Sequence, residues 1–179
     1  LTDKDINHHQ GLLARRLFEE IPSGVGRGGR LKLDAKLDEV LMHGVPWTIA
    51  QGYGTPEDLE HIESGGQLEN AAPKAVSDHA KQRGKDQLGT LGAGNHFVEV
   101  DKVDEIFDTM TAKSFGLSLN QIVVLIHTGS RGLGHQVATD YIRIMLNSLS
   151  KYNITLPDRE LACAPLSSSE GTNYFNFNS

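Results

Sequence analysis

The chain has 179 residues, a formal net charge of −6 and 38% hydrophobic residues, which suffices for one modest domain or part of a larger one. The acidic balance argues against a protein that coats nucleic acid non-specifically, since such binding rests on many lysine and arginine contacts with phosphates. No apolar run approaches the ~18 residues that a membrane span needs. With a single cysteine, Cys163, the chain is expected to be cytoplasmic and to have no membrane partner.

The first third of the chain predicts helices. Apolar residues at helical spacing predict a helix over 7–20, and a capping aspartate predicts a short one over 34–42 that stops at Gly44. The sequence Thr55-Pro-Glu-Asp58 combines a capping threonine, a proline at the first helical position and an acid three residues after the threonine. It predicts a helix that ends at Gly65 and Gly66.

A basic, glycine-rich stretch separates the first two of these helices. It contains a G-x-G-x-x-G pattern at Gly24, Gly26 and Gly29, but a helix and a proline precede it, whereas a dinucleotide fingerprint follows a strand. A surface loop that meets an RNA backbone is the better interpretation. Two basic clusters are either solvated faces or parts of an RNA groove. They are Arg27, Arg30 and Lys32, and Lys81, Arg83 and Lys85.

The second half of the chain predicts a mixed α/β fold. Helices are expected over 73–82, 103–115 and 137–149, and strands over 97–100 and 122–126. A parallel strand-helix-strand unit would place His96, before the first strand, and His127, after the second, at opposite ends of the sheet. If both histidines serve one site, the strands run antiparallel.

Two glycine-rich stretches with polar side chains stand out. Residues 88–99 read LGTLGAGNHFVE, and residues 127–136 read HTGSRGLGHQ. Neutral imidazole is the commonest metal ligand, and arginine's planar fork suits phosphate. A histidine at the end of a strand, taken alone, is more often a structural residue than a ligand. The helix after the second stretch also favours an anion at its N-terminus.

These two stretches resemble the signature segments of the RtcB family of RNA ligases. The resemblance extends through 21–26, 52–58, Arg83-Gly84 and 160–164, so it covers the chain to about Gly171. After that residue the sequence departs from the family pattern, where the resemblance leads us to expect a further helix. The family joins RNA 3′-phosphate or 2′,3′-cyclic phosphate ends, such as those of tRNA halves, to 5′-hydroxyl ends.

The resemblance also implies cofactors and partners. The family uses GTP and two Mn²⁺ ions, passes GMP from a histidine to the RNA 3′-phosphate, and then joins the 5′-hydroxyl end. His96 and His127 correspond to metal ligands, and Arg131 would grip the RNA phosphate. The GTP site would be lined by residues 95–99, which are Asn95, His96, Phe97, Val98 and Glu99. An archease-type activator is a candidate partner.

On this basis residues 1–179 are expected to form a single domain, the central part of an RtcB-like catalytic domain. The resemblance places an Asp-x-x-Cys segment before residue 1, and a third histidine ligand and the guanylylated histidine after residue 179. The segment alone would then hold no catalytic nucleophile and would be inactive. Two alternatives remain open: a metal-dependent phosphoesterase with no nucleotide step, and a non-catalytic RNA-binding fragment.

Overall fold

The computed structural model describes residues 3–24 and 37–178. The chain divides into two compact units, one of Leu1–Leu31 with Gln87–Gly129 and the other of Lys32–Asp86 with Ser130–Ser179. That both belong to one catalytic domain stays a prediction. The capping Asp34 and the basic cluster of Arg27, Arg30 and Lys32 lie outside the described residues.

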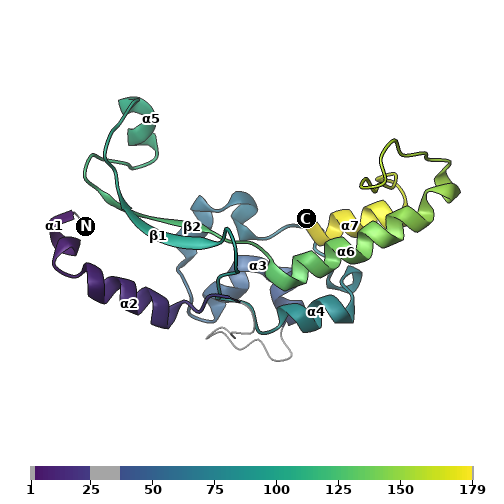
Figure 1. Cartoon of the computed structure of the whole chain (residues 1–179), viewed down its shortest axis with the longest axis horizontal. Helices are drawn as coiled ribbons and strands as arrows, with labels where there is room; N and C mark the ends of the chain where they lie inside the picture. The colour runs from purple at the N-terminus through teal and green to yellow at the C-terminus, as the bar shows by residue number, and fades with distance from the viewer. Residues whose placement is uncertain (1–2, 25–36, 179) are drawn as a thin grey trace. The chain divides into compact units, whose positions relative to one another are not determined.

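Within its described residues, the first unit contains three short helices and a β-hairpin (Figure 1). The helix expected over 7–20 is present as α2 (Gln10–Glu20), and a separate turn, α1 (Asp3–Asn7), precedes it. Apolar side chains of α1 and α2 face the strand β1 (Phe97–Lys102). The three elements line a cavity of about 260 Å³.

Strand β1 pairs with β2 (Ile122–His127) in an antiparallel two-stranded sheet. The register sets Phe97 opposite His127 and Lys102 opposite Ile122. This confirms the expected mixed fold, with antiparallel pairing and flanking helices. Directly opposed residues share a face of the sheet, so this register decides which side chains lie together.

The prediction of a helix over 103–115 is wrong for the first half of that range. The strand ladder continues one step beyond β1, because the Val103 N–H donates to Gln121 O at 2.9 Å. Helix α5 is only Thr109–Ser114, and the Asp108 carboxylate caps it by accepting from the N–H groups of Met110 and Thr111. The cap fixes the start of the helix six residues later than the apolar pattern indicated.

The second unit is mainly helical. Three expected helices differ in detail. The helix expected to stop at Gly44 is kinked there, with φ 55°, and continues through Pro46. The Thr55–Asp58 capping box starts 3₁₀ turns instead of an α-helix. Ser77 divides the helix expected over 73–82. The α-helices are α3 (Leu37–Ala50), α4 (Asp78–Gly84), α6 (Arg131–Ser148) and α7 (Ser169–Asn178). The 3₁₀ turns are η1 (Pro56–His61), η2 (Glu63–Gly66), η3 (Pro73–Ala75) and η4 (Ser150–Tyr152).

The core of the second unit lies where α6 runs between α4 and α7 (Figure 1). Ala80 on α4 and Val137 on α6 are almost completely buried. Gly84 permits this close approach, because a Cβ there would lie 2.8 Å from Leu133 Cβ. One turn further along the same face of α6, the Tyr141 ring packs against the Tyr174 ring with their centroids 5.1 Å apart.

Among residues 3–24 and 37–178, no helix combines the length and the apolar character required to cross a bilayer.

Candidate functional site

The glycine-rich loop before β1 is anchored to the segment after α2. Leu91 is buried and forms a parallel bridge with Ser23. Its N–H donates to Pro22 O at 2.9 Å, and its carbonyl accepts from the Gly24 N–H at 3.2 Å. These bonds hold the loop just ahead of its polar residues, so the positions of Asn95 and His96 follow from backbone pairing as well as from the strand.

His96 is half-buried, and two neighbours fix its imidazole. The ring lies against Gly92, where a Cβ would stand only 2.8 Å from His96 Cγ. The Nδ1 atom is 3.2 Å from Thr128 Oγ1. If Nδ1 carries the proton and donates it to the hydroxyl, Nε2 keeps its lone pair for a metal ion.

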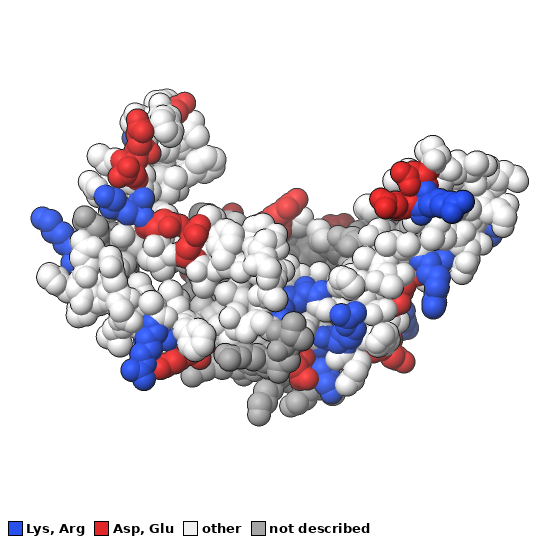
Figure 2. All heavy atoms as spheres, in the orientation of Figure 1, with Lys and Arg blue, Asp and Glu red and all other residues white. Residues whose placement is uncertain are grey.

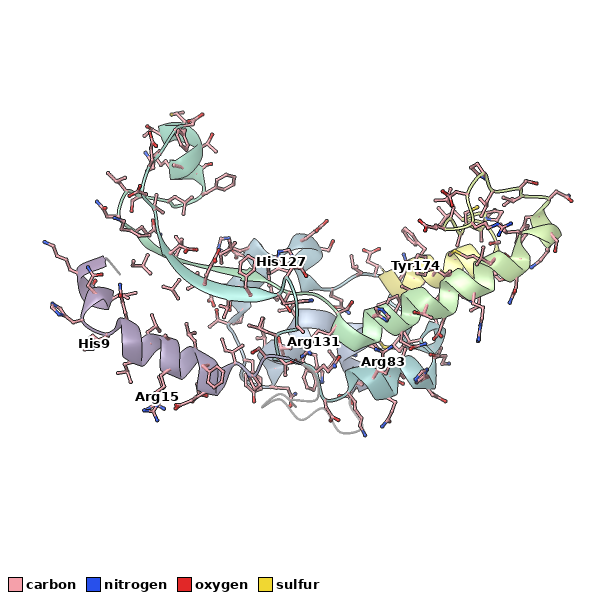
Figure 3. All side chains as sticks on the ribbon, viewed as in Figure 1. His9, Arg15, Arg83, His127, Arg131 and Tyr174 are labelled. Carbon is pink, nitrogen blue, oxygen red and sulfur yellow. The ribbon has the colours of Figure 1, made fainter. Side chains whose placement is uncertain are left out.

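His127 lies at the end of β2 (Figure 3), and its ring is close to that of His96. The centroids of the two imidazoles are 6.3 Å apart, and the rings are nearly perpendicular. Phe97 packs against the His127 ring at 5.4 Å. The antiparallel register produces this pair, since the start of β1 is opposite the end of β2. Residues 31 positions apart in sequence therefore reach one end of the sheet.

The residues expected at a GTP site lie on two faces of β1. Strand alternation puts Phe97 and Glu99 on the face of their partners His127 and Leu125, and puts Val98 on the opposite face, which looks toward α2. Asn95 and Glu99 are exposed. Of this set, His96, Phe97 and Glu99 are the side chains best placed to act with His127. Their binding of GTP stays a prediction.

The imidazole pair suits a divalent ion but does not complete a coordination shell. Imidazole nitrogen is a good ligand for Mn²⁺, usually together with carboxylate or water oxygens. In the described part of the chain, no group of three or more His, Cys, Asp or Glu side chains gathers as a metal site would require. An ion held here therefore needs ligands from elsewhere.

Arg131 belongs to the second unit, where it is the first residue of α6. Helix α6 was expected to begin at Val137 but begins six residues earlier, so Gly132 and Gly134 form part of its first turn. Arg131 has φ 50°, in the left-handed region that arginine seldom adopts. Such outliers concentrate at functional sites. Its contact with RNA phosphate stays a prediction.

A polar network on α4 and α6 was not anticipated from the sequence. Arg83 Nη1 donates to Gln136 Oε1 at 2.8 Å, Gln136 Nε2 donates to Asp140 Oδ1 at 2.9 Å, and Ser77 Oγ donates to Asp140 Oδ2 at 2.6 Å. The hydrogen bond from Ser77 holds the pKa of Asp140 below its ordinary value. Helical spacing of Gln136 and Asp140 was the available signal.

The same network assigns structural partners to one basic cluster. Lys81 pairs with Asp38 at 2.8 Å, and Arg83 on α4 (Figure 3) bonds the buried Gln136. These contacts join α4 to α3 and α6. A structural role therefore accounts for these two cations, whatever else they bind. The first cluster, at 27–32, lies outside the described residues.

Comparison with known proteins gives a consistent match. A family model described as tRNA-splicing ligase RtcB matches residues 1–178. Proteins named tRNA-splicing ligase RtcB from Pyrococcus horikoshii and Pyrococcus abyssi are 53% and 54% identical over 177 residues. The protein of that name from Methanococcus maripaludis is 51% identical over 176 residues.

Each of these alignments covers 98% of this chain but only 20%, 19% and 37%, respectively, of the relative's own length. The chain thus spans between about a fifth and a little over a third of these relatives. The similarity does not end near Gly171, as the sequence had suggested, because the family match continues to residue 178. The further helix expected there is α7.

Proposed function

The chain belongs to the RtcB family, and on this premise we propose that the protein of which it forms part is an RNA ligase. It would join RNA 3′-phosphate or 2′,3′-cyclic phosphate ends to 5′-hydroxyl ends, such as the ends of tRNA halves, using GTP and Mn²⁺. A cytoplasmic location and an archease-type activator are parts of the same proposal.

The observation that carries the proposal is the pairing of His96 with His127. The two imidazoles are 6.3 Å apart, and each belongs to a glycine-rich stretch that resembles one of the family's signature segments. An RNA-binding fragment without catalysis has no need of this pair. The thiol of Cys163 is the chain's only one, so the described part offers no thiolate cluster as an alternative metal site.

The side chains have distinct proposed roles. His96 and His127 would each supply one nitrogen to a metal site, with Thr128 fixing the ring of His96. Bound Mn²⁺ would neutralise phosphate charge and activate a nucleophile. Asn95 and the 97–99 strand would contact GTP, and Arg131 would form paired hydrogen bonds with phosphate oxygens of the RNA end.

Covalent transfer of GMP would take place on a histidine that the resemblance places beyond residue 179. That histidine would attack the α-phosphorus of GTP and release pyrophosphate. The RNA 3′-phosphate would then displace the histidine to form an RNA-GMP diphosphate linkage. Attack by the 5′-hydroxyl would release GMP. Residues of this chain would hold and orient the phosphates during these steps.

Incubation of the complete parent protein with α-labelled GTP and Mn²⁺, followed by denaturing electrophoresis, tests the proposal. A labelled protein band is expected, and it should disappear in H96A and H127A. Hydrolysis of RNA 2′,3′-cyclic phosphate with no labelled protein would indicate a phosphoesterase instead. RNA retention that is unchanged by metal removal, with neither reaction, would indicate a binding module.

A further inference from the structure

The two histidines of the candidate metal site are held in different ways. His96 Nδ1 lies 3.2 Å from Thr128 Oγ1, and the ring rests against Gly92. In the described part of the chain, neither ring nitrogen of His127 has a hydrogen-bond partner, and the residue is exposed. An exposed side chain of this kind exchanges between rotamers unless a packed neighbour restricts it.

Phe97 is the neighbour that restricts His127. The two residues are directly opposed in the antiparallel register, and their ring centroids are 5.4 Å apart with the planes tilted by 42°. Directly opposed side chains have Cβ atoms only about 5 Å apart, so two rings in these positions limit each other's rotation. Phe97 is half-buried whereas His127 is exposed. The phenyl ring is therefore the more firmly held member of the pair.

The surface around the pair agrees with a ring contact as the holding interaction. On the face drawn in Figure 2, the end of the strand pair that carries His127 (labelled in Figure 3) shows mainly uncharged side chains, whereas acidic side chains gather near α5. Packing against Phe97, rather than an ion pair, thus sets the direction of the His127 ring.

The contacts that hold the two histidines are reciprocal. Thr128, which contacts His96, directly follows His127 in the sequence. Phe97, which contacts His127, directly follows His96. Each histidine is thus held across the strand pair by the residue next to the other histidine. The register sets both contacts at once, because a slip of one residue would turn side chains to the opposite face.

We propose that Phe97 is a positioning residue whose ring orients His127 toward the metal site, a role separate from the GTP contact proposed above. This role rests on the proposed function, because it requires His127 to be a metal ligand. Phe97 itself takes no part in coordination, since a phenyl ring offers no ligand atom for Mn²⁺. It acts as the outer partners of metal ligands usually do, by holding the imidazole in the direction that binding requires.

Two other roles for Phe97 lead to different expectations. A contact with GTP alone leaves Mn²⁺ affinity unchanged when no nucleotide is present. A purely structural role lowers the affinity whether or not His127 is present, because His96 directly precedes the same strand. Positioning through His127 lowers the affinity in the absence of GTP, and only while the imidazole of His127 is there to be oriented.

The test is a titration of the complete parent protein with Mn²⁺ in the absence of GTP. F97L should weaken Mn²⁺ binding by about tenfold, because leucine stays apolar but places no flat ring against His127. F97Y keeps the ring and should bind within about twofold of the wild type. F107L is the matched control, since it makes the same change at an aromatic residue that is 90% exposed, and it should leave the affinity unchanged.

The double variant F97L/H127A separates positioning from a general structural effect. Compared with H127A, it should show no further loss of Mn²⁺ affinity, because no imidazole remains for the phenyl ring to orient. A spectrum gives a second readout. With Co²⁺ in place of Mn²⁺, F97L should shift the visible absorption band, which depends on the geometry of the ligands, and F97Y should keep the wild-type band.

Three results would overturn the positioning role while leaving the metal site in place. They are equal Mn²⁺ affinities of F97L and the wild type, the same loss from F97L with and without His127, and equal losses in F97L and F97Y. A different result tests the proposed function. If H127A binds Mn²⁺ as tightly as the wild type does, His127 is not a metal ligand, and the role of Phe97 falls with it.

Discussion

At the residue scale, the candidate site depends on how the His96 ring is held. Its imidazole is confined by Gly92 on one side and by the Thr128 hydroxyl at Nδ1. Neither neighbour would bind a metal or phosphate in the proposal, yet both decide where Nε2 points. Partners of this kind normally tune metal affinity through the ligand's orientation and tautomer.

We predict that T128V lowers Mn²⁺ affinity of the complete protein by about 10–100-fold, because the isosteric side chain removes the hydroxyl that orients His96. T128S keeps the hydroxyl and should retain most of the affinity. Isothermal titration with Mn²⁺ measures both. Equal affinities for T128V and T128S would show that the 3.2 Å contact has no part in orienting the ligand.

A second prediction compares two glycines next to the same ring. G92A should reduce Mn²⁺ affinity nearly as much as H96A, because the new methyl group would overlap the imidazole and displace it. G129A should have little effect on this affinity, since its Cβ would lie 4.0 Å from His96 Cε1, an ordinary contact. Comparable losses in both variants would contradict the observed ring position.

The third prediction concerns Arg131. R131A should raise the KM for the RNA end by about 10–100-fold through loss of charge-assisted hydrogen bonds, and should leave GTP binding nearly unchanged. R131G makes the same deletion but relieves the φ of 50°, so it separates lost charge from backbone strain. Steady-state kinetics with varied RNA and with varied GTP measure the two effects. Equal weakening of RNA and GTP binding, or weakening of neither, counts against the assigned role.

At the element scale, the packing of α4 on α6 determines how α6 is held. Its apolar part is Ala80, Val137 and the Gly84–Leu133 approach, and its polar part is the chain of hydrogen bonds from Ser77 to Arg83. Gln136 is buried and bonded at both ends of its amide. A buried network of this kind is strongly destabilised when one member is removed.

Our fourth prediction follows from Asp140, whose pKa is lowered chiefly by the Ser77 hydrogen bond and further by Gln136, His79 and Arg143. A lowered folded-state pKa stabilises the fold above the ordinary value of 3.8, and that contribution is lost as pH falls through the folded-state value. The wild-type helix pair should therefore loosen as acid is added below about pH 4. The D140N variant should lack this pH-dependent contribution to stability.

Hydrogen exchange of α4 and α6 amides in the complete protein, read between pH 3 and pH 7, measures the effect, after correction for the intrinsic pH dependence of exchange. At neutral pH D140N should lower local protection by about 1 kcal/mol, the value of one hydrogen bond to a charged group discounted for partial exposure. D78N, on a helical carboxylate outside the network, is the control. A parallel pH profile in D140N and the wild type would contradict the assignment.

At the scale of the whole molecule, the described residues leave much apolar surface of β2 in contact with solvent. Val124 is 59% exposed and Ile126 is 60% exposed. Their partners Val100 and Val98 are more covered, since they face α1 and α2. The relatives are about three to five times longer than the aligned region. We infer that the rest of the parent protein covers these strands.

The fifth prediction is that residues 1–179 alone form no stable GMP adduct and bind Mn²⁺ far more weakly than the complete protein does. Within the part of the chain that the structure describes, a metal site would receive His96 and His127 without a third ligand. Losing ligands lowers metal affinity steeply. Mn²⁺ titration and the guanylylation assay apply directly. Tight two-ion binding or a labelled adduct on the segment would show that the remaining catalytic residues lie within it.

Local sequence determined the elements with strong local signals. The β-branched run at 122–126 formed its strand, and the apolar stripe formed α2. The two glycine-rich stretches also identified the family. Local signals were weaker guides to helix boundaries: α5 and α4 start later than the sequence indicated, and α6 starts earlier, at Arg131. The side chains of Asp108 and Ser77 cap the first two of these helices, and periodicity does not report such caps.

Only the tertiary structure decided which residues meet. The sequence could say that His96 and His127 share a site if the strands are antiparallel, but the pairing of Phe97 with His127 is a long-range choice of register. Nor could sequence show that Gly92 makes room for the His96 ring, or that Arg83 bonds Gln136 across 53 positions. The physical reason is that strand propensity and glycine freedom are local properties. Register and side-chain contact are set by burial and hydrogen bonding between distant segments.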